Sequence, residues 1–237
     1  MGILDIEIHN SWKAFIEAKE VELKNIELLI GSNYTPKKEL VLRFLKTDLK
    51  NIKVLILGQD PYPEEGRATG RSFEVGDLKS WNQKFRQVSL KNIIRLIHKN
   101  YMEIDSYENI FKYSEIVKQI ENNEFKIEAP NELFKSWEEQ GVLMLNSYFT
   151  CQIGKPGSHR SVWESFARDL ISYIDEVNSD LKWFLWGKEA QSFKSLIVSG
   201  KIIESRHPMM CSNKYDDDFL KFEGFKITKN EINWLGK

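Results

Sequence analysis

The sequence predicts an α/β fold with three layers, α/β/α, around a central, mainly parallel sheet of four strands. Short, mostly apolar runs of the kind that form buried strands recur at 54–57, 142–145, 183–186 and 201–205. Helix-forming segments separate these runs. Continuous apolar strands that alternate with helices are typical of a parallel sheet covered on both faces.

Two helices are expected before the first strand. In segment 11–31, apolar residues recur at roughly helical spacing; they are Trp12, Phe15, Val21, Ile26 and Leu29. Segment 37–46 (KKELVLRFLK) predicts the second helix. After the first strand, Ser89 opens the stretch SLKNIIRLIHKNY and suits the N-cap position of a further helix.

The second half of the chain continues the alternation of strands and helices. Segments 131–140, 163–177 and 188–197 predict helices. The stretch 102–130 is charged and rich in Asn, which predicts a surface helix plus a loop. Because no internal repeat or low-complexity linker divides the chain, we interpret this stretch as an insertion within a single domain, residues 1–237.

Composition excludes several classes of protein. The net charge is −1, so any surface that binds nucleic acid must be a local patch. Two cysteines, Cys151 and Cys211, are too few for a disulfide framework, a zinc knuckle or a four-cysteine cluster, and we expect reduced thiols in the cytoplasm. The N-terminus lacks the features of a secretory signal, and no apolar run approaches the roughly 18 residues of a membrane span.

Polar residues follow three of the four predicted strands. Gln59 and Asp60 come just after the first, Asn146 follows the second, and Arg206 and His207 follow the last. Open parallel sheets bind ligands beyond the carboxyl ends of their strands. The sequence therefore predicts that a carboxylate, a carboxamide and an imidazole converge on one site.

Each of these residues also has a structural interpretation when it is taken alone. Asp60 before a proline suits a turn, Asn146 could cap a loop, and His207 could be a satisfied structural histidine. Phe73 and Trp186 would individually belong to the core. No nucleophile elbow and no phosphate-binding loop is present in the sequence. The argument for a site depends on the three polar residues together.

Six motifs, in order, resemble those of family 1 uracil-DNA glycosylases. They are GQDPYP (58–63), RATGRSFEV (67–75), SLKN (89–92), GVLMLNSYFTCQIGKPGSH (141–159), FLWGKEAQ (184–191) and RHP (206–208). The resemblance covers roughly residues 40 to 235. It implies an enzyme that hydrolyses the N-glycosidic bond of deoxyuridine in DNA, releases uracil and leaves an abasic site during base excision repair. It also implies that the base is flipped out of the duplex.

The resemblance assigns roles to the residues of the pocket. Asp60 matches the carboxylate that positions water and stabilises the cationic sugar, and His207 matches the histidine that binds O2 of the departing uracil. Asn146 matches the amide that pairs with N3–H and O4. Phe73 matches the ring on which the base stacks, and Tyr62 the wall that excludes the methyl group of thymine. The backbone of Gln59 would line the same pocket.

The resemblance also implies a DNA-binding surface. The residues that match loops near the DNA are Ser89, Lys155, Ser158, His159, Arg160, Arg206, Met210, Cys211 and Ser212. A local basic patch would be formed by Arg67, Arg71, Lys155, Arg160, Arg206 and Lys214. The implied partner is uracil-containing DNA, single- or double-stranded, bound by a monomer that needs no cofactor and no metal. A protein inhibitor or replication partners are left open.

Four departures from the family motifs keep two alternatives open. Pro63 and Thr69 stand where the family has His, Met209 replaces a serine that grips phosphate, and Cys211 replaces a leucine wedge. A glycosylase retuned to another modified pyrimidine is one alternative. The other is a non-catalytic module for DNA binding or replication on the same fold. The joint presence of Asp60, Asn146 and His207 argues against that module, because a scaffold has no need of all three.

Overall fold

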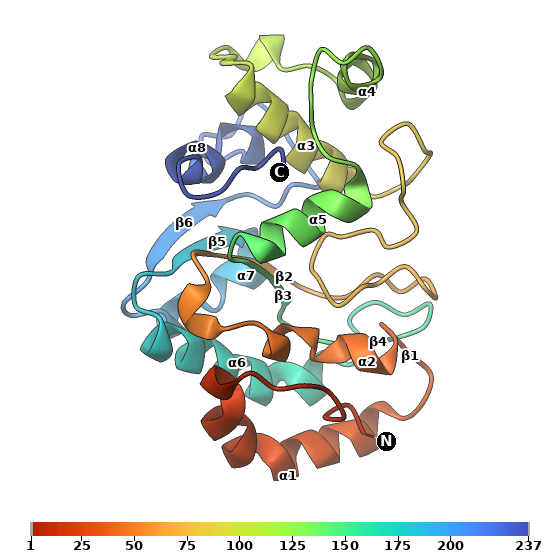
Figure 1. Cartoon of the computed structure of the whole chain (residues 1–237), viewed down its shortest axis with the longest axis vertical. Helices are drawn as coiled ribbons and strands as arrows, with labels where there is room; N and C mark the ends of the chain where they lie inside the picture. Colours follow the sequence, from red (N-terminus) through yellow and green to blue (C-terminus); the bar gives the residue numbers. More distant parts are fainter. Residues whose placement is uncertain (1, 237) are drawn as a thin grey trace.

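A computed structural model describes residues 2–236 and contains the predicted central sheet (Figure 1). Its four strands are all parallel and lie in the order β3-β2-β5-β6. They are β2 (Val54–Gly58), β3 (Val142–Asn146), β5 (Lys182–Trp186) and β6 (Lys201–Ser205). The prediction of four parallel strands is confirmed, and each bound lies within one residue of the expected one.

Alternate side chains of the strands point into two separate cores, which gives the molecule its three layers. Leu55 and Leu57 of β2 pack on one face of the sheet, whereas Val54 and Ile56 pack on the other. The first face is covered by α1 (Lys13–Ile30) and α6 (Arg160–Val177). The second face is covered by α3 (Val88–Tyr101), α5 (Pro130–Glu139) and α8 (Gly224–Thr228). The α/β/α prediction is confirmed.

The remaining elements are short and lie around this sheet. A second, antiparallel sheet pairs β1 (Tyr34–Thr35) with β4 (Cys151–Gln152). The remaining α-helices are α2 (Lys38–Val41), α4 (Tyr113–Glu121) and α7 (Lys188–Gln191). The 3-10 helices are η1 (Asn10–Trp12), η2 (Arg43–Lys46), η3 (Leu49–Asn51), η4 (Tyr107–Asn109), η5 (Lys194–Leu196) and η6 (Phe219–Lys221). Helix α4 confirms the surface helix expected within 102–130, and it lies at the opposite end of the molecule from α1. None of the helices in the described part of the chain is long and apolar enough to cross a membrane.

Two helix predictions were wrong in detail. In α1, Val21 and Leu29 are exposed, because the buried stripe follows Leu23, Ile26 and Ile30 at the three- and four-residue steps of a helix. Helix α3 begins at Val88, one residue before the expected N-cap. Ser89 is therefore a first-turn residue, and the N-cap is Gln87.

Two predicted helices are also shorter than expected. The segment 37–46 is interrupted at Leu42, whose φ of −111° and ψ of 29° lie outside the helical region, and it continues as η2. The segment 188–197 contains only α7 and η5. The Ser192 hydroxyl donates to the Glu189 carbonyl oxygen at 2.6 Å, a local bond that competes with continuation of the helix.

Candidate active site

The carboxyl ends of the four strands meet at one edge of the sheet, as their parallel register requires. Gly58 at the end of β2 lies opposite Asn146 at the end of β3, and Trp186 at the end of β5 lies opposite Ser205. A pocket of about 190 Å³ opens at this edge. Its lining includes Gly58, Gln59, Phe73, Trp186, Glu189 and His207. Gln59, Phe73 and His207 were predicted site residues, so the structure brings three of them to one pocket.

Two glycines permit this close packing. A Cβ atom on Gly58 would lie 2.6 Å from Oδ1 of Asn146, and a Cβ atom on Gly187 would lie 2.8 Å from Cβ of His207. Gly187 also has a φ of +84°, a conformation that side chains disfavour. Larger residues at these two positions would push Asn146 and His207 away from the pocket.

Asn146 is a buried amide without a partner in the protein. It is 5% exposed and lies directly behind Gly58 rather than on the wall of the pocket. No described residue forms a hydrogen bond with its side chain, whereas the backbone around it is well fixed. The Ser147 amide donates to the Gly58 carbonyl oxygen at 2.9 Å, and the Tyr148 amide donates to that of Gln59 at 3.0 Å. The backbone at Asn146 is thus fixed, and the donor and acceptor of its side chain have no partner among the described residues.

Asp60 is a half-buried carboxylate with one unsatisfied oxygen. Its Oδ1 atom is buried and has no hydrogen-bond partner among the described residues. Burial raises the pKa of the Asp60 carboxyl to about 6, and the nearby Glu189 carboxylate adds to the rise. A hydrogen bond from the Gly157 amide and the Arg160 guanidinium oppose it. Asp60 is therefore ionised at neutral pH, although its surroundings disfavour the charge.

Phe73 lies at the pocket in a strained backbone conformation. Its φ of +64° is in the left-handed region, which is unfavourable for a bulky residue and is found mainly where the surrounding structure enforces it. Its ring centroid is 5.3 Å from that of Trp186 and 6.2 Å from that of His207. Its carbonyl oxygen accepts a hydrogen bond of 3.3 Å from the Tyr62 hydroxyl. Tyr62 thus holds the Phe73 loop, and it is not among the residues that line the pocket.

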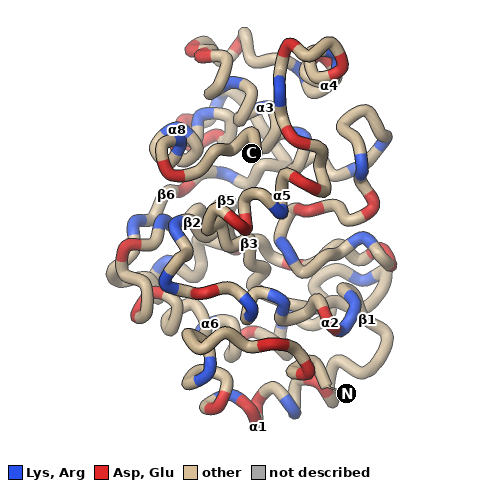
Figure 2. Tube along the Cα trace, viewed as in Figure 1, with Lys and Arg blue, Asp and Glu red and all other residues tan. Residues whose placement is uncertain are grey.

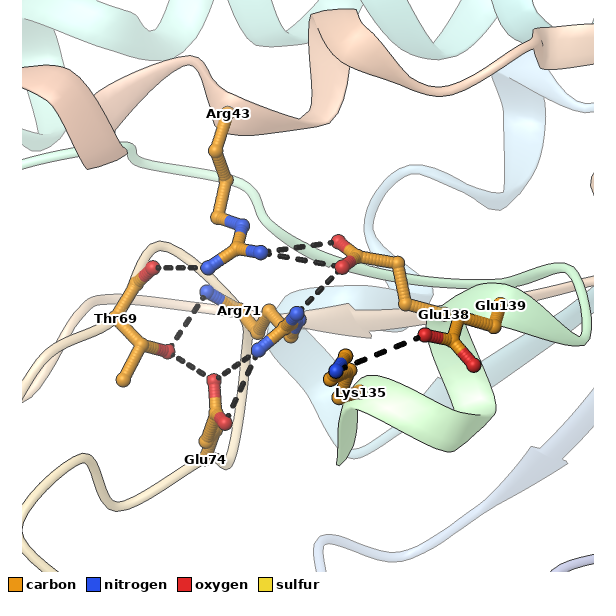
Figure 3. A network of polar contacts seen from close by, with 7 residues as sticks. All are labelled: Arg43, Thr69, Arg71, Glu74, Lys135, Glu138 and Glu139. Carbon is orange, nitrogen blue, oxygen red and sulfur yellow. Dashed lines mark hydrogen bonds and ion pairs between the residues drawn. The ribbon is translucent and has the colours of Figure 1, made fainter. Parts of the chain in front are cut away.

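A network of ion pairs connects residues 69–74, the loop that contains Phe73, to Arg43 of η2 and Glu138 of α5 (Figure 3). Arg71 donates through Nη1 to both oxygens of Glu74, at 3.1 and 2.9 Å, and through Nη2 to Glu138 of α5. Arg43 donates to the Glu138 carboxylate at 3.1 Å and to the Thr69 carbonyl oxygen at 3.2 Å. The Thr69 hydroxyl donates to Glu74. The prediction that Arg71 belongs to a surface basic patch was wrong, because its side chain is only 9% exposed and both of its Nη atoms form ion pairs within the protein.

His207 lines the pocket, and a backbone hydrogen bond fixes the tautomer of its ring. The Met209 amide donates to Nδ1 of His207 at 3.1 Å, so a neutral ring carries its proton on Nε2. Desolvation lowers the pKa of His207, which favours that neutral form. The loop is fixed by Asn92 of α3, whose amide donates to the Pro208 carbonyl oxygen at 2.6 Å. His207 can therefore donate a hydrogen bond to a group in the pocket.

The predicted DNA-binding residues lie in loops and in the first turns of α3 and α6, and several are engaged within the protein. Arg160 pairs with Glu189 at 2.9 Å, and Arg206 pairs with Asp217 at 2.7 Å. His159 is buried, with Nδ1 2.9 Å from the Thr150 hydroxyl. The Ser158 hydroxyl accepts a hydrogen bond from the Gln152 amide, and the Ser212 hydroxyl accepts one from the Lys214 amide. Ser89 is half-buried in the first turn of α3.

The predicted basic patch is thus weaker than its composition suggests. Arg67 pairs with Glu64 and Asp77, and acidic residues alternate with basic ones along the whole chain (Figure 2). Of the six predicted cations, Lys155 and Lys214 form no ion pair with the described residues.

The loop after His207 exposes methionine and buries cysteine. Met209 is 58% exposed and Met210 is 75% exposed. Cys211 is half-buried, packs against the core, and has its sulfur 3.7 Å from the Pro208 carbonyl oxygen. Of the two residues expected at the tip of this loop, Met210 is the one that projects into solvent.

Glu189 is a pocket residue that the sequence analysis missed. Its Oε1 atom accepts hydrogen bonds from the Tyr148 hydroxyl at 2.7 Å and from Arg160. It follows β5 by three residues, so its place after a strand end was the available signal. Within residues 2–236, no three His, Cys, Asp or Glu side chains are grouped so that they could hold a metal ion.

These features define a three-layer α/β protein with a small pocket at the carboxyl edge of its sheet, lined by Gln59, Phe73 and His207, with Asn146 behind Gly58. The model of the Uracil DNA glycosylase superfamily matches residues 46–227. The chain belongs to this superfamily.

Individual relatives match over most of the chain. A uracil-DNA glycosylase of Psychromonas ingrahamii is 34% identical over 212 residues, which is 87% of this chain and 82% of the relative. A uracil-DNA glycosylase of Borrelia duttonii is 30% identical over 219 residues, 86% of this chain and 85% of the relative. The crystal structure of mimivirus uracil-DNA glycosylase superposes with a TM-score of 0.70 at 26% identity, covering 94% of this chain and 83% of that one.

Proposed function

We propose that this protein is a uracil-DNA glycosylase that hydrolyses the N-glycosidic bond of deoxyuridine in DNA and leaves an abasic site. Membership of the superfamily and similarity to enzymes of that name support the activity. One observation in the structure carries the assignment. A buried oxygen of Asp60 and the buried side chain of Asn146 have no hydrogen-bond partner among the described residues, although buried polar groups are normally paired.

The pocket recognises one base through shape and hydrogen bonds. Its volume of about 190 Å³ is below the range of about 300–1,000 Å³ that is usual for small-molecule sites, so it suits a single flipped base. The base stacks on Phe73. The Asn146 side chain offers one donor and one acceptor, which can pair with O4 and N3–H of uracil and cannot pair in the same way with cytosine. Tyr62 sets the position of Phe73 through its hydrogen bond, and by fixing this loop it limits the room for the methyl group of thymine.

Hydrolysis then proceeds with charge separation between sugar and base. The bond between C1′ and N1 breaks, and its electron pair remains on the uracil. Asp60 stabilises the positive charge that develops on the sugar and accepts a hydrogen bond from the attacking water, whose hydroxyl group is transferred to C1′ while its proton is released. The neutral His207 donates from Nε2 to O2 of uracil, where negative charge accumulates. Each group thus acts where charge grows in the transition state.

The finer assignments form part of the same proposal. We place DNA contacts on the loops that carry Ser89, Lys155, Ser158, Arg206 and Ser212. His159, which is buried, orders its loop through Thr150. The enzyme acts as a monomer on single- or double-stranded DNA, and both cysteines are free thiols, in keeping with the cytoplasm. Thr69 had suggested a changed base specificity. Its hydroxyl bonds Glu74 away from the pocket, so this substitution bears on the loop and uracil remains the base we assign.

The direct test is excision from matched oligonucleotides. Each carries one uracil, thymine, cytosine or modified pyrimidine at the same position, and alkaline cleavage of the abasic product reports release of the base. We expect cleavage of the uracil strand alone. Cleavage at another pyrimidine in preference to uracil would identify a retuned glycosylase, and binding without any cleavage would identify a non-catalytic module.

A further inference from the structure

A second concavity lies away from the base pocket, between α4 and the loop that leads into α3. Its volume is about 530 Å³, larger than that of the base pocket. One wall is the loop from Trp81 to Phe85, and the facing wall is α4, with Tyr113, Val117 and Lys118. We call this feature the Phe85–Tyr113 groove. Helix α4, which lies within the stretch 102–130, therefore forms one side of the groove.

The walls of the groove are rigid and aromatic. The Phe85 and Tyr113 rings pack edge to face, with centroids 5.6 Å apart and an interplanar angle of 89°. The Tyr113 hydroxyl donates to the Trp81 carbonyl oxygen at 2.8 Å, which joins the two walls. The Trp81 indole donates to the Glu128 carbonyl oxygen at 2.7 Å. The Lys91 ammonium lies 4.8 Å from the Phe85 ring centroid and 5.8 Å from that of Tyr113.

The free charge of the groove is positive. Lys84, Lys91 and Lys118 line it, and none of them forms an ion pair with the described residues. The one acidic residue in the lining, Glu121, accepts a hydrogen bond of 2.9 Å from the Asn82 amide. A groove with three unpaired cations and aromatic walls is complementary to a polyanion that carries flat rings.

Helix α3 connects the groove to the loop that carries His207. Lys91 is adjacent to Asn92, whose amide holds the Pro208 carbonyl oxygen in the loop of His207 at 2.6 Å. Consecutive Cα atoms are about 3.8 Å apart, so the cation of the groove and the anchor of the catalytic loop share one turn of α3.

We propose that the Phe85–Tyr113 groove binds an unpaired nucleotide of the strand that flanks the excised base. The base stacks on the aromatic walls, and the phosphates pair with the lysines, which draws the Lys91 ammonium off the Phe85 ring. Stacking platforms combined with cationic grooves are the general means of binding single strands. An acidic peptide with an aromatic side chain shares this chemistry, but the position of Lys91 next to Asn92, which holds the His207 loop, favours DNA. The inference rests on the proposed glycosylase function.

The test compares single-stranded substrates of different length. One oligonucleotide carries uracil with a single nucleotide on each side, and two others add a tail of several thymidines on the 5′ or the 3′ side. We expect one tail to lower KM at least about fivefold, the lower end of what stacking of a base on an aromatic ring contributes, with kcat unchanged. Phe85→Leu and Lys91→Gln should remove this gain and leave the short substrate unaffected. Lys91→Gln should also reduce the salt dependence of KM for the tailed substrate by about 0.7 in logarithmic slope.

Lys24→Gln on the distant helix α1 is the matched control and should keep the full gain (Figure 1). Equal KM values for short and tailed substrates would overturn the proposal, and so would a gain that survives in Phe85→Leu and Lys91→Gln. In both cases, excision of uracil would still support the glycosylase assignment. Absence of excision from every substrate would overturn both. A labelled thymidine oligonucleotide without uracil should bind the wild type more tightly than Lys91→Gln. Binding of an Asp- and Phe-rich peptide in its place would assign the groove to a protein partner.

Discussion

Two clusters of polar residues lie on either side of the Phe73 loop, and they differ in how their charges are satisfied. In the Arg43–Arg71–Glu138 network, two guanidinium groups meet two carboxylates (Figure 3). At the strand ends, Asp60 has a buried oxygen without a partner. Buried ion pairs hold a structure in place when every member is matched, whereas an unmatched buried charge lowers stability. We infer that the paired cluster supports the loop, whereas the unpaired cluster can bind a substrate.

The largest effect is expected from breaking the paired cluster. Arg71→Leu leaves Glu74 buried without a cation and should lower the free energy of unfolding by about 3–5 kcal/mol. The double variant Arg71→Leu/Glu74→Leu removes both charges and should recover most of that loss. Urea unfolding of the three proteins measures the difference. A loss in the double variant as large as in the single one would show that packing, rather than charge, holds the loop.

At Asp60, removal of the charge is expected to raise the free energy of unfolding rather than to lower it. The Asp60 carboxyl has a pKa of about 6 in the folded protein and 3.8 ordinarily, so the folded state holds its proton more tightly. The resulting cost is absent below pH 3.8, grows as pH rises and is complete above about 6. Asp60→Asn removes this cost. Because Asp60 is only half-buried and solvent screens part of the effect, the variant should be more stable by about 1 kcal/mol at pH 8 and by less at pH 5. Urea unfolding at both pH values tests this, and a loss of stability at pH 8 would contradict it.

A smaller effect is expected where the site meets the DNA duplex. Met210 is 75% exposed, whereas Cys211 packs against the core, so Met210 is the side chain that can fill the space of a flipped base. Cys211, which stands in place of the family's leucine wedge, is smaller than leucine and recovers about 1 kcal/mol less of the unstacking cost. We expect excision from single strands and U·G mismatches to be about fivefold or more faster than from U·A pairs. Met210→Ala should widen this preference without changing the single-strand rate.

Single-turnover excision from three matched oligonucleotides at one salt concentration is the measurement for Met210. Equal rates on all three substrates, in both proteins, would show that neither base flipping nor this loop limits the reaction. Met209→Ala serves as a matched control, because Met209 is also exposed and lies in the same loop.

The smallest effect concerns the charge that faces Asp60. The groups that act on Asp60 are Glu189, Arg160 and the Gly157 amide. Because the reaction needs ionised Asp60, kcat/KM should fall about tenfold for each pH unit below about 6. Glu189→Gln removes the negative charge that raises the pKa of Asp60, so activity should extend to lower pH, with a few-fold gain at pH 5. Glu204→Gln on β6 is the control, and an equal shift in both variants would remove Glu189 from this role.

Of the residues that line the pocket, Gln59, Phe73 and His207 were expected from the sequence, whereas the contacts that support them were not. Asp60, Asn146 and His207 could be placed together because each follows a parallel strand, and parallel strands end at the same edge. The pairing of Arg71 with Glu138 could not be predicted, since 67 residues separate them and only the packing of α5 against the Phe73 loop brings them together. Arg71 was therefore assigned to the surface, as its residue type suggested.

Local sequence patterns also failed to predict backbone conformations that tertiary contacts determine. Phe73 adopts a left-handed φ that no pattern in the sequence indicates, because Tyr62 and the ion-pair network impose it from both sides. The stretch 102–130 was correctly predicted as a surface helix plus loop. Its groove depends on the packing of Tyr113 against Phe85, two residues from separate segments.

The measurement that tests the central claim most directly is single-turnover excision of uracil by Asp60→Asn at pH 7.5. The control is Asp169→Asn, a carboxylate that is 50% exposed on α6 and pairs with Lys19. Loss of one preorganised electrostatic group costs about 10²-fold or more. We predict that Asp60→Asn excises uracil at least about 100-fold more slowly than the wild type, while it unfolds at higher urea and the control is unchanged. A wild-type rate in a folded Asp60→Asn protein would contradict the account.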